Sequence, residues 1–285
     1  MLDEPAALPA DVTDGFDAFR DSLKQRGDAP LLGRFILERG LIEHHFSQDR
    51  NAAEMFVEAA RLTGLQYELT GVLGKRTKFQ QNALSQLVLL AESRGAPVDN
   101  IADDTKAAIP ETLALNDDTL LEHTQFTVSS SGAGALAHID PGYQPTLDPL
   151  DQCILLALCL NVRNTSPVHG LTNEQMAPYV TRVLENPRNW SVHTMGLLLR
   201  ARLEAGRTRT VERSVLQLQA LVDQMKTTVK DAAKPADSAP ASERLAYLFD
   251  LVLPSRWQME RELGRRLLEL GVVRSALDIF TRLEI

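Results

Sequence analysis

The sequence predicts an all-α fold, in which antiparallel helix pairs form an α-solenoid and two flexible linkers interrupt the stack. Three observations support this prediction. Only 5% of the residues are aromatic, and helix formers dominate, whereas strands favour aromatic and β-branched residues. Apolar residues recur at helical spacing along most of the chain, and one motif appears near both ends of this pattern. No segment shows convincing strand character.

The first 94 residues divide into a poorly defined N-terminal segment, 1–29, and a helical repeat-like region, 30–94. Apolar spacing predicts one helix that begins near Pro30 and a second that ends at Gly64. Apolar side chains at i, i+3, i+4 and i+7 predict a third helix over 78–93.

The remainder of the chain divides into a loop-rich linker over 95–147, a central helical region over 148–226, a second linker over 227–241 and a final helical region over 242–285. The linkers are rich in small residues and proline and show little periodicity. Asp148 is a suitable N-cap and Pro149 suits the first helical turn. The helix that follows is apolar all round, so we expect it at the centre of its domain.

A short motif is repeated. LGRFILERGLI (32–42) aligns without gaps with LGRRLLELGVV (263–273), and AAEMF (52–56) aligns with ALDIF (276–280). The first copy carries seven extra residues between the two blocks. Because two glycines keep their offset and the blocks keep their order, we interpret this as a genuine internal repeat.

The second copy of the repeat has a physical interpretation. Gly264 and Ala276 would let two helices approach closely, Gly271 would let the chain turn, and Phe280 would fill the seam. This pattern is typical of a tetratricopeptide repeat, a helix pair of ~34 residues that needs stacked neighbours to bury its apolar face. We therefore expect 242–285 to begin a tetratricopeptide repeat array and to expose an apolar face at its end.

Composition restricts the class of protein. A formal net charge of −8 argues against nucleic-acid binding by bulk charge. Cys153 and Cys159 lie in an apolar run, which indicates buried, reduced thiols. The N-terminus lacks a secretory signal, and the longest apolar run is shorter than the ~20 residues of a membrane-spanning helix. These features predict a cytoplasmic protein, with a nuclear location also open.

No motif indicates a catalytic residue, a cofactor or a metal. GVLGKRTKFQ (71–80) lacks the first glycine and the hydroxyl residue of a phosphate-binding loop. His44 and His45 are adjacent, so on a helix they cannot act as an i, i+4 metal-ligand pair. Asp117 and Asp118 have polar neighbours that would not raise a carboxyl pKa, so we interpret them as solvated caps.

Positive charge is concentrated between Thr181 and Arg213, where seven arginines and three glutamates leave a net charge of +4. Arginines on adjacent helices of a solenoid can bind carboxylates, and a second basic group follows Gly74. The candidate protein-binding residues are Arg200, Arg202, Arg207, Arg209, Arg213, Lys75, Arg76 and Lys78. The alternative is a solvated helix surface with ordinary salt bridges.

Four long segments resemble the eukaryotic family of tetratricopeptide repeat protein 27. They are LTGVLGKRTKFQ (69–80), the stretches 152–204 and 207–224, and PSRWQMERELGRRLLELGVVRSALDIFTRLE (254–284). The resemblance covers most of 30–285 and implies the N-terminal portion of a longer protein, truncated at the start of its repeat array. It also implies a scaffold or chaperone adaptor that assists the assembly of large complexes. The implied partners belong to a heat-shock chaperone system or to spliceosomal ribonucleoprotein assembly.

Three functional hypotheses remain open from the sequence. The first is a non-enzymatic scaffold that binds proteins, with no membrane and no small-molecule substrate. The second is an RNA- or ribonucleoprotein-associated protein that uses the basic helices of 181–213. The third is an enzyme whose site is assembled from distant residues, for which the sequence offers no motif.

Overall fold

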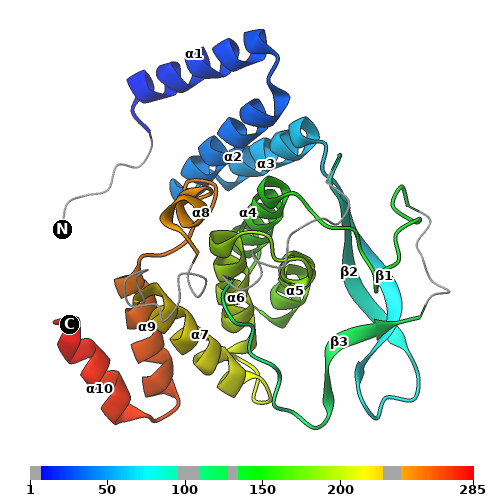
Figure 1. Ribbon diagram of the computed structural model, residues 1–285, viewed down its shortest axis with the longest axis vertical. Coiled ribbons are helices and arrows are strands. Elements are labelled where there is room, and N and C mark those ends of the chain that lie inside the picture. Colours follow the sequence, from blue (N-terminus) through cyan, green and yellow to red (C-terminus); the bar gives the residue numbers. More distant parts are fainter. Residues whose placement is uncertain (1–7, 96–108, 128–133, 168, 227–238) are drawn as a thin grey trace.

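The computed structural model describes residues 8–95, 109–127, 134–167, 169–226 and 239–285 (Figure 1). Within this part there are ten helices and three strands. The helices are α1 (Ala10–Arg26), α2 (Ala29–His45), α3 (Asp49–Thr63), α4 (Pro149–Thr165), α5 (Gly170–Glu185), α6 (Trp190–Glu204), α7 (Val211–Lys226), α8 (Ala241–Leu245), α9 (Arg256–Glu269) and α10 (Val273–Arg282). The strands are β1 (Gln66–Thr77), β2 (Leu84–Glu92) and β3 (Leu120–Phe126). The predicted linker over 227–241 lies outside the described residues except for its last three.

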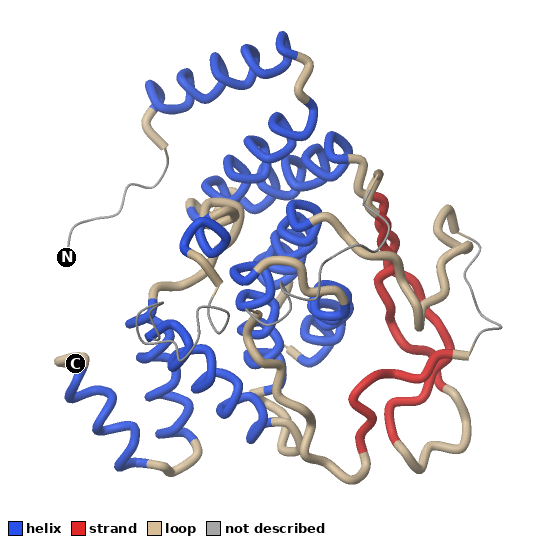
Figure 2. Tube along the Cα trace, in the orientation of Figure 1, coloured by secondary structure: helices blue, strands red, loops and turns tan. Residues whose placement is uncertain are grey.

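The helices pack largely in the order of the chain. From α2 to α7 each helix contacts the next one, α7 contacts α9, and α9 contacts α10. Figure 2 shows these helices in blue, with the strands gathered on one side of the molecule. Packing between successive helices is the arrangement expected of helical repeats, in which each unit buries its apolar face on its neighbours.

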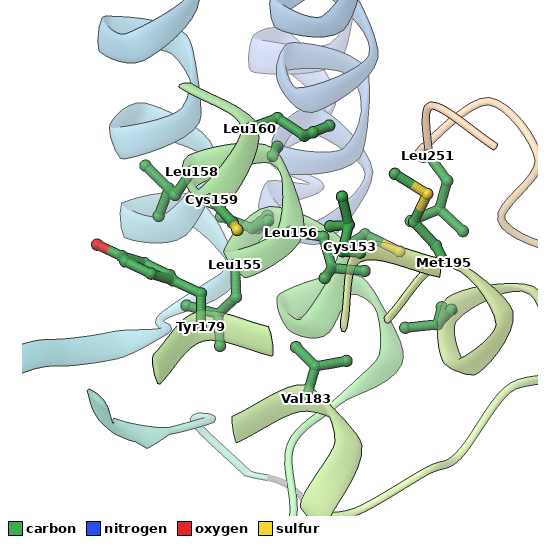
Figure 3. Close-up of a cluster of buried hydrophobic side chains, with 14 of the residues drawn as sticks. Cys153, Leu155, Leu156, Leu158, Cys159, Leu160, Tyr179, Val183, Met195 and Leu251 are labelled. Atoms are coloured by element: carbon green, nitrogen blue, oxygen red, sulfur yellow. The ribbon is translucent and has the colours of Figure 1, made fainter. Parts of the chain in front are cut away.

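Helix α4 forms the centre of the core, as its all-apolar sequence predicts. The Asp148 side chain accepts a hydrogen bond from the Leu150 N–H at 2.8 Å, and Pro149 occupies the first turn. Every side chain from Cys153 to Leu160 is buried. Figure 3 shows leucines of α4 packed against Tyr179 and Val183 of α5 and Met195 of α6. A helix without a polar face is stable in water only when neighbours surround it in this way.

The expectation of an all-α fold without strands is wrong. Strands β2, β1 and β3, in that order, form a three-stranded antiparallel sheet. In the β1–β2 ladder Gln66 faces Glu92 and Gly74 faces Leu84. The helix predicted over 78–93 is replaced by a turn followed by β2, and β3 lies inside the predicted linker over 95–147.

Strand β2 was taken for a helix because both of its faces are buried. Leu89 and Ala91 point into the main helical core, whereas Val88 and Leu90 belong to a second, smaller core on the other face of the sheet. A strand covered on both sides has a continuous apolar run, which cannot be distinguished from a buried helix by periodicity alone.

The cover of the second core comes from the predicted linker. Leu136 and Ile139 are buried there beside Val72 of β1. The amide of Gln144 bonds the edge of β2, since its Oε1 accepts from the Ala91 N–H at 3.1 Å and its Nε2 donates to the Leu89 carbonyl at 3.0 Å. Residues 134–147 therefore fold onto the sheet as structural cover.

The repeated motif forms two helix pairs, α2–α3 and α9–α10. In the second pair a Cβ added at Gly264 would lie 3.0 Å from the Phe280 ring, and Gly271 makes the turn with φ +80°. Both features were predicted. In the first pair the aligned Gly40 lies inside α2, where an added Cβ would lie 2.7 Å from the Phe56 ring. The two copies therefore use close glycine–phenylalanine packing, but with different glycines.

Candidate interaction surfaces

Arg200 and Arg202 lie on α6, Arg213 lies on α7, and Arg207 and Arg209 lie in the turn between these helices. Their guanidinium groups contact other parts of the molecule. Arg202 on α6 forms a two-point ion pair with Glu262 on α9, with Nε–Oε1 at 3.0 Å and Nη2–Oε2 at 2.7 Å. Arg213 on α7 pairs with Glu204 and, at 2.7 Å, with Glu122 of β3. These pairs connect the α6–α7 surface to the C-terminal helix pair and to the sheet.

Glu174 on α5 connects the two predicted basic groups. Its Oε1 lies 2.7 Å from Nη2 of Arg207, and its Oε2 lies 3.0 Å from Nη1 of Arg76. The structure therefore brings Arg76 and Arg207 to the same carboxylate. Lys75 is half-buried in β1 rather than in a basic turn, and Lys78 is exposed where the turn begins.

The remaining two arginines contact an extended segment, residues 109–119, that crosses α6 and α7 before β3 begins. Arg200 donates to the Leu113 carbonyl at 3.3 Å, and Arg209 hydrogen-bonds the Thr119 hydroxyl. Burial lowers the pKa of Arg200, with a further contribution from the nearby Arg213. Arg200 and Arg209 thus bind a carbonyl and a hydroxyl of their own chain, whereas the sequence analysis expects them to bind carboxylates of a partner.

Sequence reasoning missed two further residues of this surface. Gln217 is 1% exposed, and its amide binds the main chain of the extended segment at both Glu111 and Leu113. His193 is 3% exposed and lies 3.1 Å from the Thr112 hydroxyl. The available signal was weak, since each is one polar residue within an otherwise apolar helix face.

The residues with catalytic potential occupy structural positions. Burial raises the pKa of Cys159 to about 12 and that of Cys153 well above its usual range, so neither thiol is ionised near neutrality. Asp117 accepts hydrogen bonds from the Thr119 hydroxyl and from two backbone N–H groups, which lower its pKa to about 2. It is a cap, as predicted. No group of three or more potential metal ligands occurs among the residues that the structure describes.

A different kind of surface lies at the end of the helix stack. Helix α10 packs on α9 through Ala276, Ile279 and Phe280. Val273, at the first position of α10, and Leu277 are exposed, the latter at 61%. Leu268 of α9 is also exposed, as are Leu270 and Val272 between the helices and Ile285 after α10. We call these six residues the α10 face.

Helices that pack on their neighbours in chain order are the arrangement found in helical repeat proteins. The chain is 43% identical to TPR repeat-containing protein C19B12.01 of Schizosaccharomyces pombe over 90% of its length, and 35% identical to the tetratricopeptide repeat protein 27 homolog of Dictyostelium discoideum over 93%. Over this span the chain belongs to the family of tetratricopeptide repeat protein 27 homologues.

The relatives are longer proteins. The matched region spans 35% of the Schizosaccharomyces protein, 30% of the Dictyostelium protein and 33% of the essential for maintenance of the cell wall protein 1 of Saccharomyces cerevisiae, which is 29% identical. The chain thus spans about a third of the length of the relatives that it matches. No protein-family model and no solved structure matches the chain. None of the described helices is long and apolar enough to cross a membrane.

Proposed function

We propose that the protein is a non-enzymatic scaffold that binds other proteins through stacked helices. The packing of successive helices on one another supports this proposal most directly, because stacked helix pairs present an extended surface to partners. An apolar side chain exposed to water loses the roughly 25 cal/mol per Å² that its burial would provide. Several exposed apolar side chains within one part of a structure are typical of an interaction site.

The occupant that fits the α10 face is an amphipathic helix pair of the same kind as α9–α10. That pair is itself covered by α7 on its inner side, and Arg202 fixes it to α6. A further helix pair would pack on α9–α10 in the way that α9 packs on α7. The matched region is about a third of each relative, and the rest of the relative supplies a candidate sequence for this further helix pair.

The test uses a fragment of about 70 residues of the Schizosaccharomyces relative, a length of about two repeats, taken from directly after its matched region. We expect this fragment to bind the chain, and Leu277→Glu to weaken binding about tenfold or more, as for a hot-spot residue. Leu171→Glu is the matched control, because Leu171 is 70% exposed on α5, away from the α10 face. If calorimetry shows that both variants bind the fragment equally, a further helix pair does not stack on the α10 face.

The family resemblance supports a finer proposal, in which the scaffold is a cytoplasmic or nuclear adaptor for a heat-shock chaperone or for spliceosomal assembly factors. No residue of this chain specifies either partner. Co-purification of a heat-shock chaperone with the full-length relative would support this role if it is lost when glutamate replaces the residue that aligns with Leu277. A location outside both compartments would contradict it.

The RNA hypothesis receives less support from the geometry. Six of the seven arginines between 181 and 213 lie within 4 Å of a carboxylate or hydrogen-bond a neighbouring element: Arg182, Arg200, Arg202, Arg207, Arg209 and Arg213. Their charge is therefore largely compensated. RNA binding that falls steeply with salt, and that is lost in Arg207→Gln, would revive this alternative.

A further inference from the structure

Residues 109–119 lie on α6 and α7 as a bound peptide would. The segment has no helix or strand, and it runs from beside α6 to the start of β3 (Figure 1). It carries three acidic residues, Glu111, Asp117 and Asp118, and no basic residue. Helix α6 supplies Arg200 and the turn between α6 and α7 supplies Arg209, so the charges of segment and surface are complementary.

The surface recognises the main chain of this segment. Gln217 accepts from the Leu113 N–H at 3.0 Å and donates to the Glu111 carbonyl at 3.0 Å. Arg200 donates both to the Leu113 carbonyl at 3.3 Å and to Gln217 Oε1 at 2.9 Å. A side-chain amide that bonds residues i and i+2 of an extended chain reads backbone shape, which any sequence without proline at these positions can provide.

The segment buries few of its own side chains. Pro110 is buried, but from Glu111 to Leu120 no side chain is fully buried, and the apolar Leu113 and Leu115 are half-buried. The contact therefore contains little of the apolar burial that makes an association permanent. By contrast, Gln217 and His193 are almost fully buried with the segment in place, so a displacing peptide would have to supply their hydrogen-bond partners. Replacement of the segment by another peptide therefore costs less free energy than removal of the segment with nothing in its place.

The surface also offers a contact that the segment does not use. A cavity of about 610 Å³ lies between residues 109–112 and the turn from α5 to α6, and Arg188 lines it. Within the described part of the chain, Nε and Nη2 of Arg188 are buried and have no hydrogen-bond partner. These two nitrogens form the edge of the guanidinium that binds a carboxylate in two-point geometry. Glu111 and Glu185 also line the cavity, which disfavours a doubly charged phosphate.

We propose that the α6–α7 surface is a binding site for an extended acidic peptide of a partner protein, and that residues 109–119 occupy this site in cis. A partner peptide displaces the segment when it makes the same main-chain hydrogen bonds and adds a carboxylate to Arg188. This site is separate from the α10 face, so either proposal can fail without the other.

The first test uses a peptide of residues 109–119, acetylated at its N-terminus, amidated at its C-terminus and labelled for fluorescence anisotropy. The receptor is the whole chain with Leu113→Pro, which removes the N–H that binds Gln217 in cis and leaves α6 and α7 unchanged. We expect this chain to bind the peptide about tenfold more tightly than the wild type does. Adding Gln217→Ala should abolish the gain, whereas Gln219→Ala, at an exposed position of α7, should keep it.

Two further arms make the outcome decisive. A peptide with Ile109→Asp should bind more tightly than the unmodified one, and Arg188→Met should remove that advantage. If neither peptide binds a Leu113→Pro chain that remains folded by circular dichroism, the proposal is overturned. Binding that is unaffected by Gln217→Ala would also overturn it, because the peptide would then lie elsewhere.

A measurement on the wild-type chain covers the case in which Leu113→Pro does not fold. Hydrogen exchange of the Leu113 amide should proceed by local opening, faster than exchange of the Leu198 amide in the buried part of α6. Exchange of both amides at the same rate, with the rate of global unfolding, would show that the segment is a permanent part of the fold and would overturn the proposal.

Discussion

At the scale of single residues, buried polar side chains carry information that the sequence does not display. Gln217 and His193 appear as isolated polar residues in apolar helices, and only their contacts with residues 111–113 explain them. Asp117 and Gly271 are different, because a cap and a tight turn are local features. Both were predicted, since the physical requirement lies within a few residues of each.

His193 predicts a pH dependence of stability. Burial lowers its pKa to about 4, from an ordinary value of about 6.5. The unfolded chain therefore takes up a proton before the folded chain does as the pH falls, so stability is lost between about pH 6.5 and pH 4. The full loss is about 3 kcal/mol.

Urea unfolding at pH 7.5 and pH 5 checks this prediction. His193→Gln should lose less stability between the two pH values than the wild type does. His44, whose pKa is also lowered by burial, is present in both proteins, so its contribution cancels in the comparison. An identical pH dependence of the two proteins would contradict the assignment.

At the scale of elements, helices were predicted better than strands. Helices α4, α9 and α10 follow from local periodicity, an N-cap and glycine positions. Strand β2 was mistaken for a helix because its two buried faces hide the alternation that usually reveals a strand. The cover formed by 134–147 was mistaken for a linker, because its small residues and prolines are typical of loops.

Leu136 tests whether the segment 134–147 is structural. It is buried beneath the sheet, so Leu136→Ala should lower the free energy of unfolding by about 2–5 kcal/mol. Leu245→Ala, at an exposed position in α8, should change it by less than about 0.5 kcal/mol. Chemical denaturation measures the free energy of unfolding of both variants. If the two substitutions change it equally, residues 134–147 do not stabilise the fold and act as a linker.

At the scale of the whole molecule, arginines connect elements that are distant in the sequence. Arg202 reaches α9, Arg213 reaches β3, and Arg76 and Arg207 meet at Glu174 on α5. The cluster of positive charge was evident in the sequence. Its partners were not, because they lie between 9 and 98 residues away.

The Arg202–Glu262 pair predicts a measurable coupling between α6 and α9. Both side chains are partly exposed, so a double-mutant cycle with Arg202→Met and Glu262→Gln should give a coupling free energy of about 0.5–1 kcal/mol. Raising the salt concentration should reduce this coupling by screening. Fully additive effects at low salt would indicate that the pair does not fix the C-terminal helices to α6.

By itself, the sequence determined the mostly helical character, the central position of α4, the glycine–phenylalanine packing of α9–α10 and the family. Each of these depends on local periodicity or on long matched segments. Only the tertiary structure decided that three strands form a sheet, that 134–147 covers it, and that residues 109–119 lie on α6 and α7. The physical reason is that these features are stabilised by contacts between residues far apart in the chain, whose energy is not visible in any local window of the sequence.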